Sequence, residues 1–277
     1  MMIPHILTLQ NIALYRRSAL AASVAILSCM GCQVYPFPLT VTSHPASAQP
    51  EVCYKLYKTA APTLKNWQSQ YPKLDAIYIG PFYSKEEALF IGEFLETLSY
   101  PHPYLIFDPA IAENSGLYPY FDETILPIVR QICMHADLIM PNYSEAHLLL
   151  QQDIPKDIPS SRDILSVCQK LTDLGPQQIV ITSLPTLNDE LKNVSYDNET
   201  MTFEEAVTIK IDYEDALSKE IFTSVLIGSI LQDQPLHRSI GKATEFLTDC
   251  LRSAHLYNTS ANEGLPFELH LASLVRT

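Results

Sequence analysis

Asn142 and Glu145 are the two residues whose types and spacing point most directly to chemistry. Three residues apart, an amide and a carboxylate lie together at the start of a helix, where they could face a bound ligand. The same pair also fits a capping box, in which the side chains bind free N–H groups of the helix and no ligand is needed. Asp108 is a second candidate at the end of a strand-like run, although Asp108-Pro109 also favours a simple turn. A ligand site and a structural role are therefore both open.

Polar or small residues follow four strand-like runs where each run ends: Gly80, Asp108, Asn142 and the pair Thr182-Ser183. Open parallel sheets bind ligands at the carboxyl ends of their strands, so we expect these positions to line one crevice. The sequence has no Gly-x-x-x-x-Gly-Lys phosphate loop, Gly-x-Gly-x-x-Gly after a strand, His-Glu-x-x-His or Gly-x-Ser-x-Gly. This argues against P-loop NTPases, glycine-fingerprint dinucleotide enzymes, zinc proteases and α/β-hydrolases.

Short apolar runs alternate with helix-length segments, which predicts parallel strands joined by crossover helices. The predicted strands cover residues 5–10, 33–41, 75–80, 103–108, 137–141 and 178–183. An antiparallel hairpin is expected over 191–196 and 201–211, and then helices over 216–232 and 235–256. We predict one α/β domain over residues 1–257, an open, mainly parallel sheet flanked by helices on both faces, and a loosely attached tail over 258–277.

The composition excludes some partners. The chain has 18 Lys and Arg against 31 Asp and Glu, a formal net charge of −13. No nucleic-acid partner is expected, because that affinity comes mostly from basic groups that displace counterions from phosphates. The six scattered cysteines favour reduced thiols. The segment 16–30 resembles a signal peptide, but a strand-like run precedes it and it is too short to span a membrane. We interpret it as the first helix of a cytoplasmic protein with no membrane partner.

Seven segments occur in the order found in one enzyme family. They cover residues 6–12, 38–44, 75–80, 108–119, 136–146, 174–182 and 222–228. From about Ile6 to Leu256 the chain resembles the pyridoxal/pyridoxamine kinase branch of the ribokinase-like superfamily. The resemblance implies transfer of the γ-phosphoryl group of ATP to the hydroxymethyl group of a small-molecule substrate, a vitamin B6 vitamer. It also implies Mg²⁺ as a cofactor and, as in many family members, a homodimer.

The resemblance implies roles for individual residues. The general base would be Glu220, and the anion site would be Ser218 and Lys219. The nucleotide would be contacted by Asn142, Thr182 and Ser183. The metal would be held by Glu145 together with Asp108 or Glu113. The substrate would be contacted by Asn11, Ser43, His44 and Gly80.

Several positions depart from the family pattern. Leu217-Ser218-Lys219-Glu220 stands where the family has Gly-Thr-Gly-Asp, so Leu217 would crowd the backbone N–H groups around the phosphoryl group. Glu220 keeps a carboxylate, displaced by about one methylene length, and a misplacement near 1 Å can cost about a hundredfold in rate. The chain has eight glycines where average usage would give about 19, and the deficit is concentrated at the nucleotide site.

Three functions stay open at this point: an active vitamin B6 kinase, a catalytically silent vitamin B6 binder or dimer partner of a true kinase, and a hydroxymethylpyrimidine kinase. Residues 217–220 discriminate between the first two. The 38–45 loop discriminates the third, because that loop is altered where family members hold the pyridine ring.

Overall fold

The computed structural model describes residues 3–15, 17–43, 53–59, 73–98, 102–113, 116–186, 190–209, 218–260 and 263–275. Within them, one large sheet has nine strands in the order β11-β10-β9-β8-β5-β4-β1-β2-β3. Its strands are β1 (His5–Ala13), β2 (Gln33–Thr42), β3 (Cys53–Lys55), β4 (Ala76–Ile79), β5 (Tyr104–Phe107), β8 (Leu138–Ile139), β9 (Gln178–Pro185), β10 (Glu190–Asp197) and β11 (Thr202–Ile209). A separate small hairpin pairs β6 (Ala112–Glu113) with β7 (Gly116–Leu117).

The centre of the sheet is parallel and its two ends are antiparallel. The pairs from β2 through β1, β4, β5 and β8 to β9 are parallel, whereas β3, β10 and β11 pair antiparallel with their neighbours. This confirms the predicted mainly parallel sheet and its late hairpin. Strand β2 contains Pro36 and Pro38, and β3 pairs with it only over Thr40–Thr42, so the prolines lie where no neighbour needs their missing N–H groups.

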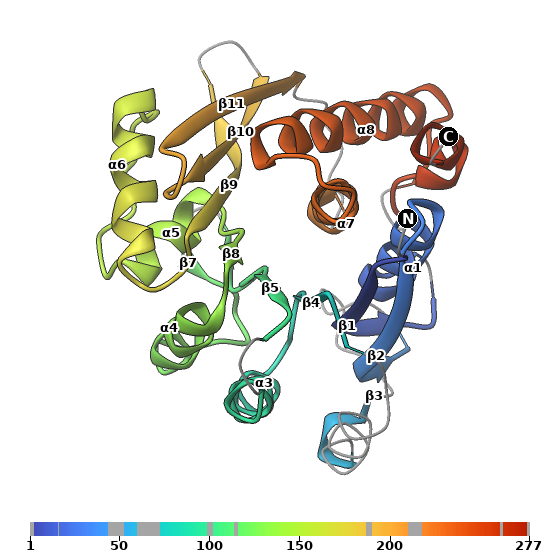
Figure 1. Ribbon diagram of the computed structural model, residues 1–277, viewed down its shortest axis with the longest axis horizontal. Helices are drawn as coiled ribbons and strands as arrows, with labels where there is room; N and C mark the ends of the chain where they lie inside the picture. Colours follow the sequence, from blue (N-terminus) through green and yellow to red (C-terminus); the bar gives the residue numbers. More distant parts are fainter. Residues whose placement is uncertain are drawn as a thin grey trace.

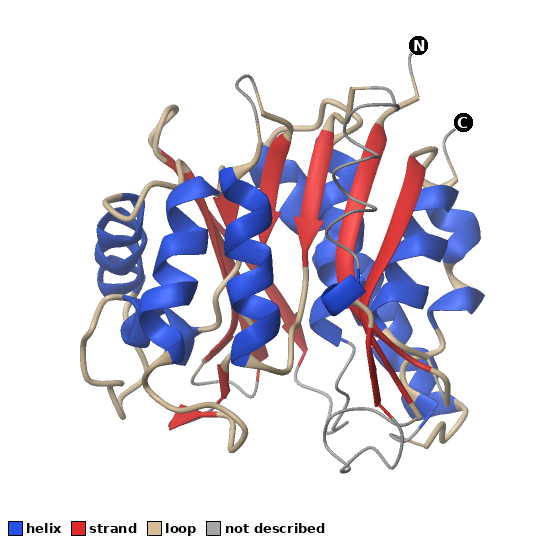
Figure 2. Ribbon diagram, turned by 90° about the horizontal axis from the view of Figure 1, so that it is seen from below, coloured by secondary structure: helices blue, strands red, loops and turns tan. Residues whose placement is uncertain are grey.

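Helices cover both faces of the sheet (Figures 1 and 2). They are α1 (Ala19–Cys29), α3 (Lys85–Glu96), α4 (Ile125–His135), α5 (Tyr143–Leu149), α6 (Ser161–Thr172), α7 (Ser218–Ile230) and α8 (Leu236–Leu256). Alternate residues of each central strand point to opposite faces, so Ile77 and Ile79 join the core under α3 to α6, whereas Ala76 and Tyr78 join the core under α1, α7 and α8. Strands buried on both faces are apolar throughout, which explains the continuous apolar runs.

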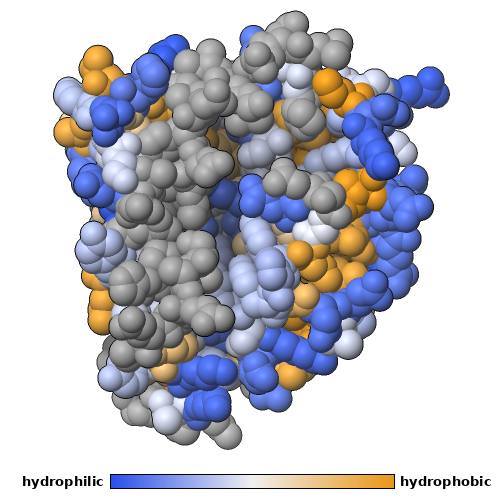
Figure 3. All heavy atoms as spheres, turned by 180° about the vertical axis from the view of Figure 1, so that it is seen from behind, coloured by the Kyte–Doolittle hydropathy of each residue, from blue (hydrophilic) through white to orange (hydrophobic). Residues whose placement is uncertain are grey.

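The first predicted helix is α1, as expected from segment 16–30. Among the described residues, no helix combines the length and apolar character that crossing a membrane requires. In the view of Figure 3, hydrophilic residues outline much of one rim, and hydrophobic residues reach the surface in separate patches.

The expectation of a loosely attached tail is wrong for the part of the tail that the structure describes. Leu265, Phe267 and Leu274 are buried in the core under α1, α7 and α8. Two short 3-10 turns, Phe267–Leu269 and Leu271–Leu274, carry two of these side chains. Arg17 also bonds Glu268, with 2.7 Å between Nε and Oε1. The lack of a long apolar run hid this packing, because three well-spaced apolar side chains suffice for it.

Candidate active site

The four predicted strand ends lie at the same edge of the sheet. The backbone N–H of Gly80 donates to the carbonyl of Leu9 within β1, that of Asp108 donates to Ile79 at the end of β4, and Asn142, just beyond β8, forms a parallel bridge with Thr182 of β9. The reason is the parallel register, which brings the carboxyl ends of neighbouring strands together. Three of these four residues carry polar side chains; Gly80, Asp108 and Thr182 are buried, and Asn142 is half-buried.

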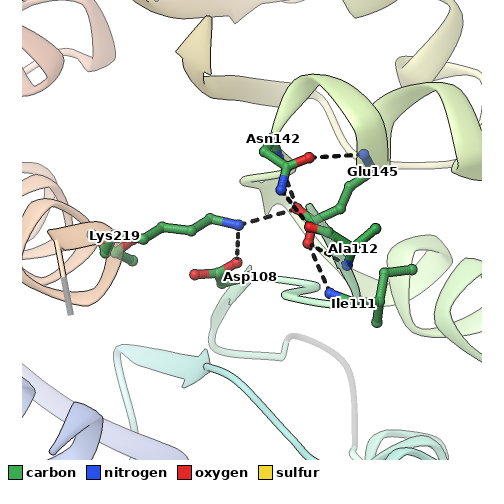
Figure 4. Close-up of polar contacts among 7 residues, drawn as sticks. Asp108, Ile111, Ala112, Asn142, Glu145 and Lys219 are labelled. Carbon is green, nitrogen blue, oxygen red and sulfur yellow. Dashed lines mark hydrogen bonds and ion pairs between the residues drawn. The ribbon is translucent and has the colours of Figure 1, made fainter. Parts of the chain in front are cut away.

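Asn142 and Glu145 form a complete capping box at the start of α5. Asn142 Oδ1 accepts from the Glu145 backbone N–H at 2.9 Å, and Glu145 Oε2 accepts from the Asn142 backbone N–H at 2.8 Å. Both side chains also reach the segment after β5 (Figure 4). Asn142 Nδ2 donates to the carbonyl of Ala112 at 2.7 Å, and Glu145 Oε1 accepts from the N–H of Ile111 at 2.7 Å. The capping interpretation is confirmed, and the pair additionally binds α5 to this segment.

The turn after β5 explains why these N–H groups point at Glu145. Asp108 ends the strand, Pro109 follows, and Ala110 adopts a positive φ of 43°. A left-handed residue reverses the chain direction, and the N–H groups of Ile111 and Ala112 both donate to Glu145 Oε1, at 2.7 and 3.3 Å. The positive φ lies at Ala110, and no regular turn is assigned over residues 108–111, so the turn interpretation of the Asp-Pro pair stays a prediction.

Lys219 joins the far side of this cluster from the first turn of α7. Its Nζ lies 2.6 Å from Asp108 Oδ1 and 3.1 Å from Glu145 Oε2 (Figure 4). Both carboxylate side chains are fully buried, whereas the lysine side chain is 20% exposed. One ammonium thus stands between two buried carboxylates that come from different strands and helices.

Burial and neighbouring charges shift the pKa values of Asp108 and Lys219. Burial raises the pKa of Asp108 to about 6, because removal from water disfavours the carboxylate; Lys219 opposes the shift and Glu145 adds to it. Burial alone would lower the pKa of Lys219, but the two carboxylates outweigh it and raise that pKa above its ordinary value. Lys219 therefore stays protonated at neutral pH.

Glu220 is buried in the first turn of α7, beside Lys219. It lies near the fully buried Tyr78 of β4, whose pKa is raised first by burial and then by the negative charges of Asp108 and Glu220. One helix start thus carries both Lys219, which pairs with Asp108 and Glu145, and Glu220, whose negative charge acts on Tyr78 together with that of Asp108. Ser218 is partly exposed at the first position of that helix, and Leu217 lies outside the described residues.

The residues predicted to contact the substrate differ in what surrounds them in the structure. Asn11 donates from Nδ2 to Glu87 Oε2 at 3.2 Å. Gly80 is needed because a Cβ there would lie 2.5 Å from Nε2 of Gln10, so its space is taken by a protein side chain. Ser43 follows the end of β2 and is partly exposed, and His44 lies outside the described residues.

Sequence reasoning missed Glu87, a buried carboxylate at the start of α3. It accepts from the Asn11 amide, from the Thr40 hydroxyl and, at 2.6 Å, from the Tyr83 backbone N–H. The spacing Ser84-x-x-Glu87 was a visible signal, since Ser84 caps this helix, but that pattern indicates only a helix start. The side chain instead connects α3 to the ends of β1 and β2.

The remaining predicted site residues, Thr182, Ser183 and Glu113, lie in different surroundings. Thr182 is buried beside Asn142, and its Oγ1 has no hydrogen-bond partner within the described part of the chain. Ser183 is exposed with a φ of 58°, and its N–H bonds Asn193 Oδ1 at 3.0 Å, in an irregular stretch of the β9–β10 pairing. Glu113 is exposed on β6, and no contact given by the structure joins it to Asp108 or Glu145 within the described ranges.

A divalent cation does not fit the predicted metal ligands as they are arranged. Each Glu145 oxygen already accepts two hydrogen bonds or ion-pair contacts, so only Asp108 Oδ2, which has no hydrogen-bond partner among the described residues, is left to a cation, since Oδ1 is paired with Lys219. Among the described residues, no group of three or more His, Cys, Asp or Glu side chains is placed to hold a metal ion. The prediction that Glu145 holds a metal together with Asp108 or Glu113 therefore does not fit this arrangement.

Comparison with solved structures confirms the fold. A protein from Bacteroides thetaiotaomicron VPI-5482 superposes with a TM-score of 0.93 at 25% identity, over 99% of this chain and 95% of its own. An orthorhombic crystal form with pyridoxal superposes with a TM-score of 0.91. The pyridoxal kinase of Lactobacillus plantarum superposes with a TM-score of 0.87 at 19% identity, over 99% of this chain and 97% of its own. The predicted pyridoxal kinase-like fold is thus confirmed.

Comparison of sequences identifies the family. The hydroxymethylpyrimidine/phosphomethylpyrimidine kinase of Aquifex aeolicus (strain VF5) is 23% identical over 182 residues, which are 65% of this chain and 68% of that protein. The sequence model described as phosphomethylpyrimidine kinase matches residues 64–264, well over half of the chain and including Asp108, Glu145 and Lys219. The chain therefore belongs to the phosphomethylpyrimidine kinase family.

Proposed function

We propose that this protein transfers the γ-phosphoryl group of ATP to the hydroxymethyl group of a vitamin B6 vitamer. The observation that carries the proposal is the start of α7, where Lys219 and the buried Glu220 enter the polar cluster at the carboxyl edge of the sheet. Phosphoryl transfer needs positioning, charge neutralisation and a group near the acceptor hydroxyl, and this helix start offers a candidate for each.

Each residue of that helix start has a chemical role in the proposal. The 13-residue helix α7 presents backbone N–H groups at its N-terminus, which bind an anion and favour negative charge. The Lys219 ammonium, which lies beside Asp108 and Glu145, adds a full positive charge near this helix start. The Glu220 carboxylate accepts the proton of the substrate hydroxymethyl group as its oxygen attacks phosphorus, a role that positioned carboxylates fill in general-base catalysis.

The choice of a pyridine substrate is supported by the Bacteroides thetaiotaomicron relative, for which a crystal form with pyridoxal exists. A second candidate substrate is a hydroxymethylpyrimidine, which the family match and the Aquifex aeolicus relative favour. Both candidates are aromatic nitrogen heterocycles with a hydroxymethyl group, so the same helix start serves either. Residues that contact the ring, with Asn11 and Ser43 as candidates, would decide between them.

The test is a phosphoryl-transfer assay followed by ³¹P NMR, with ATP, Mg²⁺ and either pyridoxal or hydroxymethylpyrimidine. We expect product from pyridoxal, and we expect Glu220→Gln to lower turnover by roughly 10²- to 10⁴-fold, as is typical for the loss of a general base. The matched control is Glu86→Gln, which changes an exposed glutamate in the first turn of α3 and should leave turnover unchanged.

Each alternative function predicts a different result. Product from the pyrimidine alone would replace the vitamin B6 proposal by the second candidate. No product from either substrate, with pyridoxal binding detected by titration calorimetry, would identify a catalytically silent binder. Equal turnover of the native chain and Glu220→Gln would exclude Glu220 as the base.

A further inference from the structure

We propose that the Lys219 ammonium takes the place of a divalent cation between Asp108 and Glu145, so that this cluster binds phosphate groups without recruiting a metal ion. The phosphate part rests on the proposed function, whereas the replacement of the cation does not.

The position of the ammonium supports the proposal. Nζ lies 2.6 Å from one carboxylate and 3.1 Å from the other, and these carboxylates come from separate segments of the chain. Two buried carboxylates this close to a common point require a positive charge, because each unpaired charge costs several kcal/mol in a buried site. Lys219 supplies that charge from within the chain.

The hydrogen bonds of Glu145 also argue against a metal ion at this position. Glu145 Oε1 accepts from the N–H groups of Ile111 and Ala112, and Oε2 accepts from the Asn142 N–H and from Lys219. A carboxylate offers about four lone-pair sites, so this one is fully used. A metal ion would have to displace the ammonium or break the capping box, and with the ammonium in place it would meet a like charge.

The ammonium still has capacity for a ligand. It carries three N–H donors, two of which the carboxylates use, and the side chain is 20% exposed although both carboxylates are fully buried. The ammonium lies beside Asp108 and Glu145, at the far end of a side chain that starts in the first turn of α7 (Figure 4), and an anion is favoured between it and that helix N-terminus. A phosphate oxygen there would therefore meet a lysine and backbone N–H groups.

The test measures Mn²⁺ binding by electron paramagnetic resonance to the full chain, without nucleotide or vitamer. The native chain should show no saturable binding, whereas Lys219→Ala should gain one equivalent of bound Mn²⁺, because the two carboxylates then lack their cation. Lys219→Ala combined with Glu145→Gln should lose it again. Lys192→Ala, which removes a lysine paired with Glu205 on the hairpin at 2.8 Å, is the matched control and should behave as the native chain.

Calorimetry measures the ATP affinity in EDTA and in Mg²⁺, and it tests whether the cluster binds phosphate groups without a metal ion. The native affinities should differ little, and the difference should grow for Lys219→Ala. One equivalent of Mn²⁺ bound by the native chain and abolished by Glu145→Gln would overturn the proposal, even if Lys219→Ala does not fold. Because Mn²⁺ binding is measured without turnover, a failure to phosphorylate any substrate would overturn the proposed function and leave this result intact.

Discussion

At the scale of single residues, Asn142 serves two segments at once. Its Oδ1 caps α5 through the Glu145 N–H, and its Nδ2 holds the carbonyl of Ala112. A purely local cap would need only the first bond. The second bond couples the helix start to the turn that follows Asp108, so this residue contributes to the shape of the proposed site as well as to the stability of its helix.

We expect Asn142→Ala to destabilise the protein by about 2–3 kcal/mol, because it removes a cap worth about 1 kcal/mol and leaves a buried carbonyl without its donor at a similar cost. Urea unfolding is the measurement. The matched control is Ser160→Ala, which removes the capping box of the more exposed helix α6 and should cost about 1 kcal/mol. An Asn142→Ala effect no larger than the Ser160→Ala effect would contradict the second role.

At the scale of elements, α5 carries both the capping box and a buried histidine. His147 packs against Tyr143, with 4.6 Å between the ring centroids. Burial lowers the pKa of His147, since it disfavours the charged imidazolium; the nearby Gln152 side chain acts in the opposite direction, and the Lys170 charge adds to the lowering. The helix that supplies Glu145 is therefore sensitive to acid.

We expect the native protein to lose stability as the pH falls through about 6.5, the ordinary pKa of histidine. Below that pH the unfolded chain binds a proton at His147 that the folded chain does not, so this contribution to stability is present above the unfolded pKa and lost below it. His147→Gln should reduce the fall in unfolding free energy between pH 7.5 and pH 5, measured by urea titration. His237→Gln, which changes an exposed histidine of α8, serves as the control. An unchanged pH dependence for His147→Gln would exclude this mechanism.

At the scale of the whole molecule, the two faces of the sheet are closed by different parts of the chain. One core lies under α3 to α6, which follow one another between residues 85 and 172. The other is assembled from both ends of the chain, α1 on one side and α7, α8 and the final turns on the other. The core that supports Lys219 and Glu220 thus depends on the last residues described.

We expect Phe267→Ala to destabilise the protein by about 3–5 kcal/mol, the usual cost of removing a buried aromatic side chain. Thermal and urea unfolding of the full chain would measure it. Leu269→Ala, in the same 3-10 turn but 59% exposed, should stay within about 0.5 kcal/mol of the native chain. Equal and small effects of the two substitutions would mean that the final turns contribute little to the core.

The local features of this protein follow from short-range patterns in its amino-acid sequence. The apolar runs of the central strands, the alternation with helices and the Asn142-x-x-Glu145 spacing depend on neighbouring residues. The structure contains each of them, although β8 covers only Leu138–Ile139 of the predicted 137–141 and β9 continues to Pro185. The common edge of the strand ends also followed, because parallel pairing leaves little freedom once the strands are known.

The contacts between distant side chains, by contrast, depend on how the elements pack together. Lys219 is 74 residues from Glu145 in the sequence and Glu87 is 76 from Asn11, and no local pattern specifies such pairs. Sequence reasoning assigned Asp108, Glu145 and Glu113 to a metal and Lys219 to an anion, whereas the fold directs Lys219 to the first two and leaves Glu113 exposed. The physical reason is that long-range contacts depend on sheet register and helix packing, and a side chain takes the partner that lies within its reach.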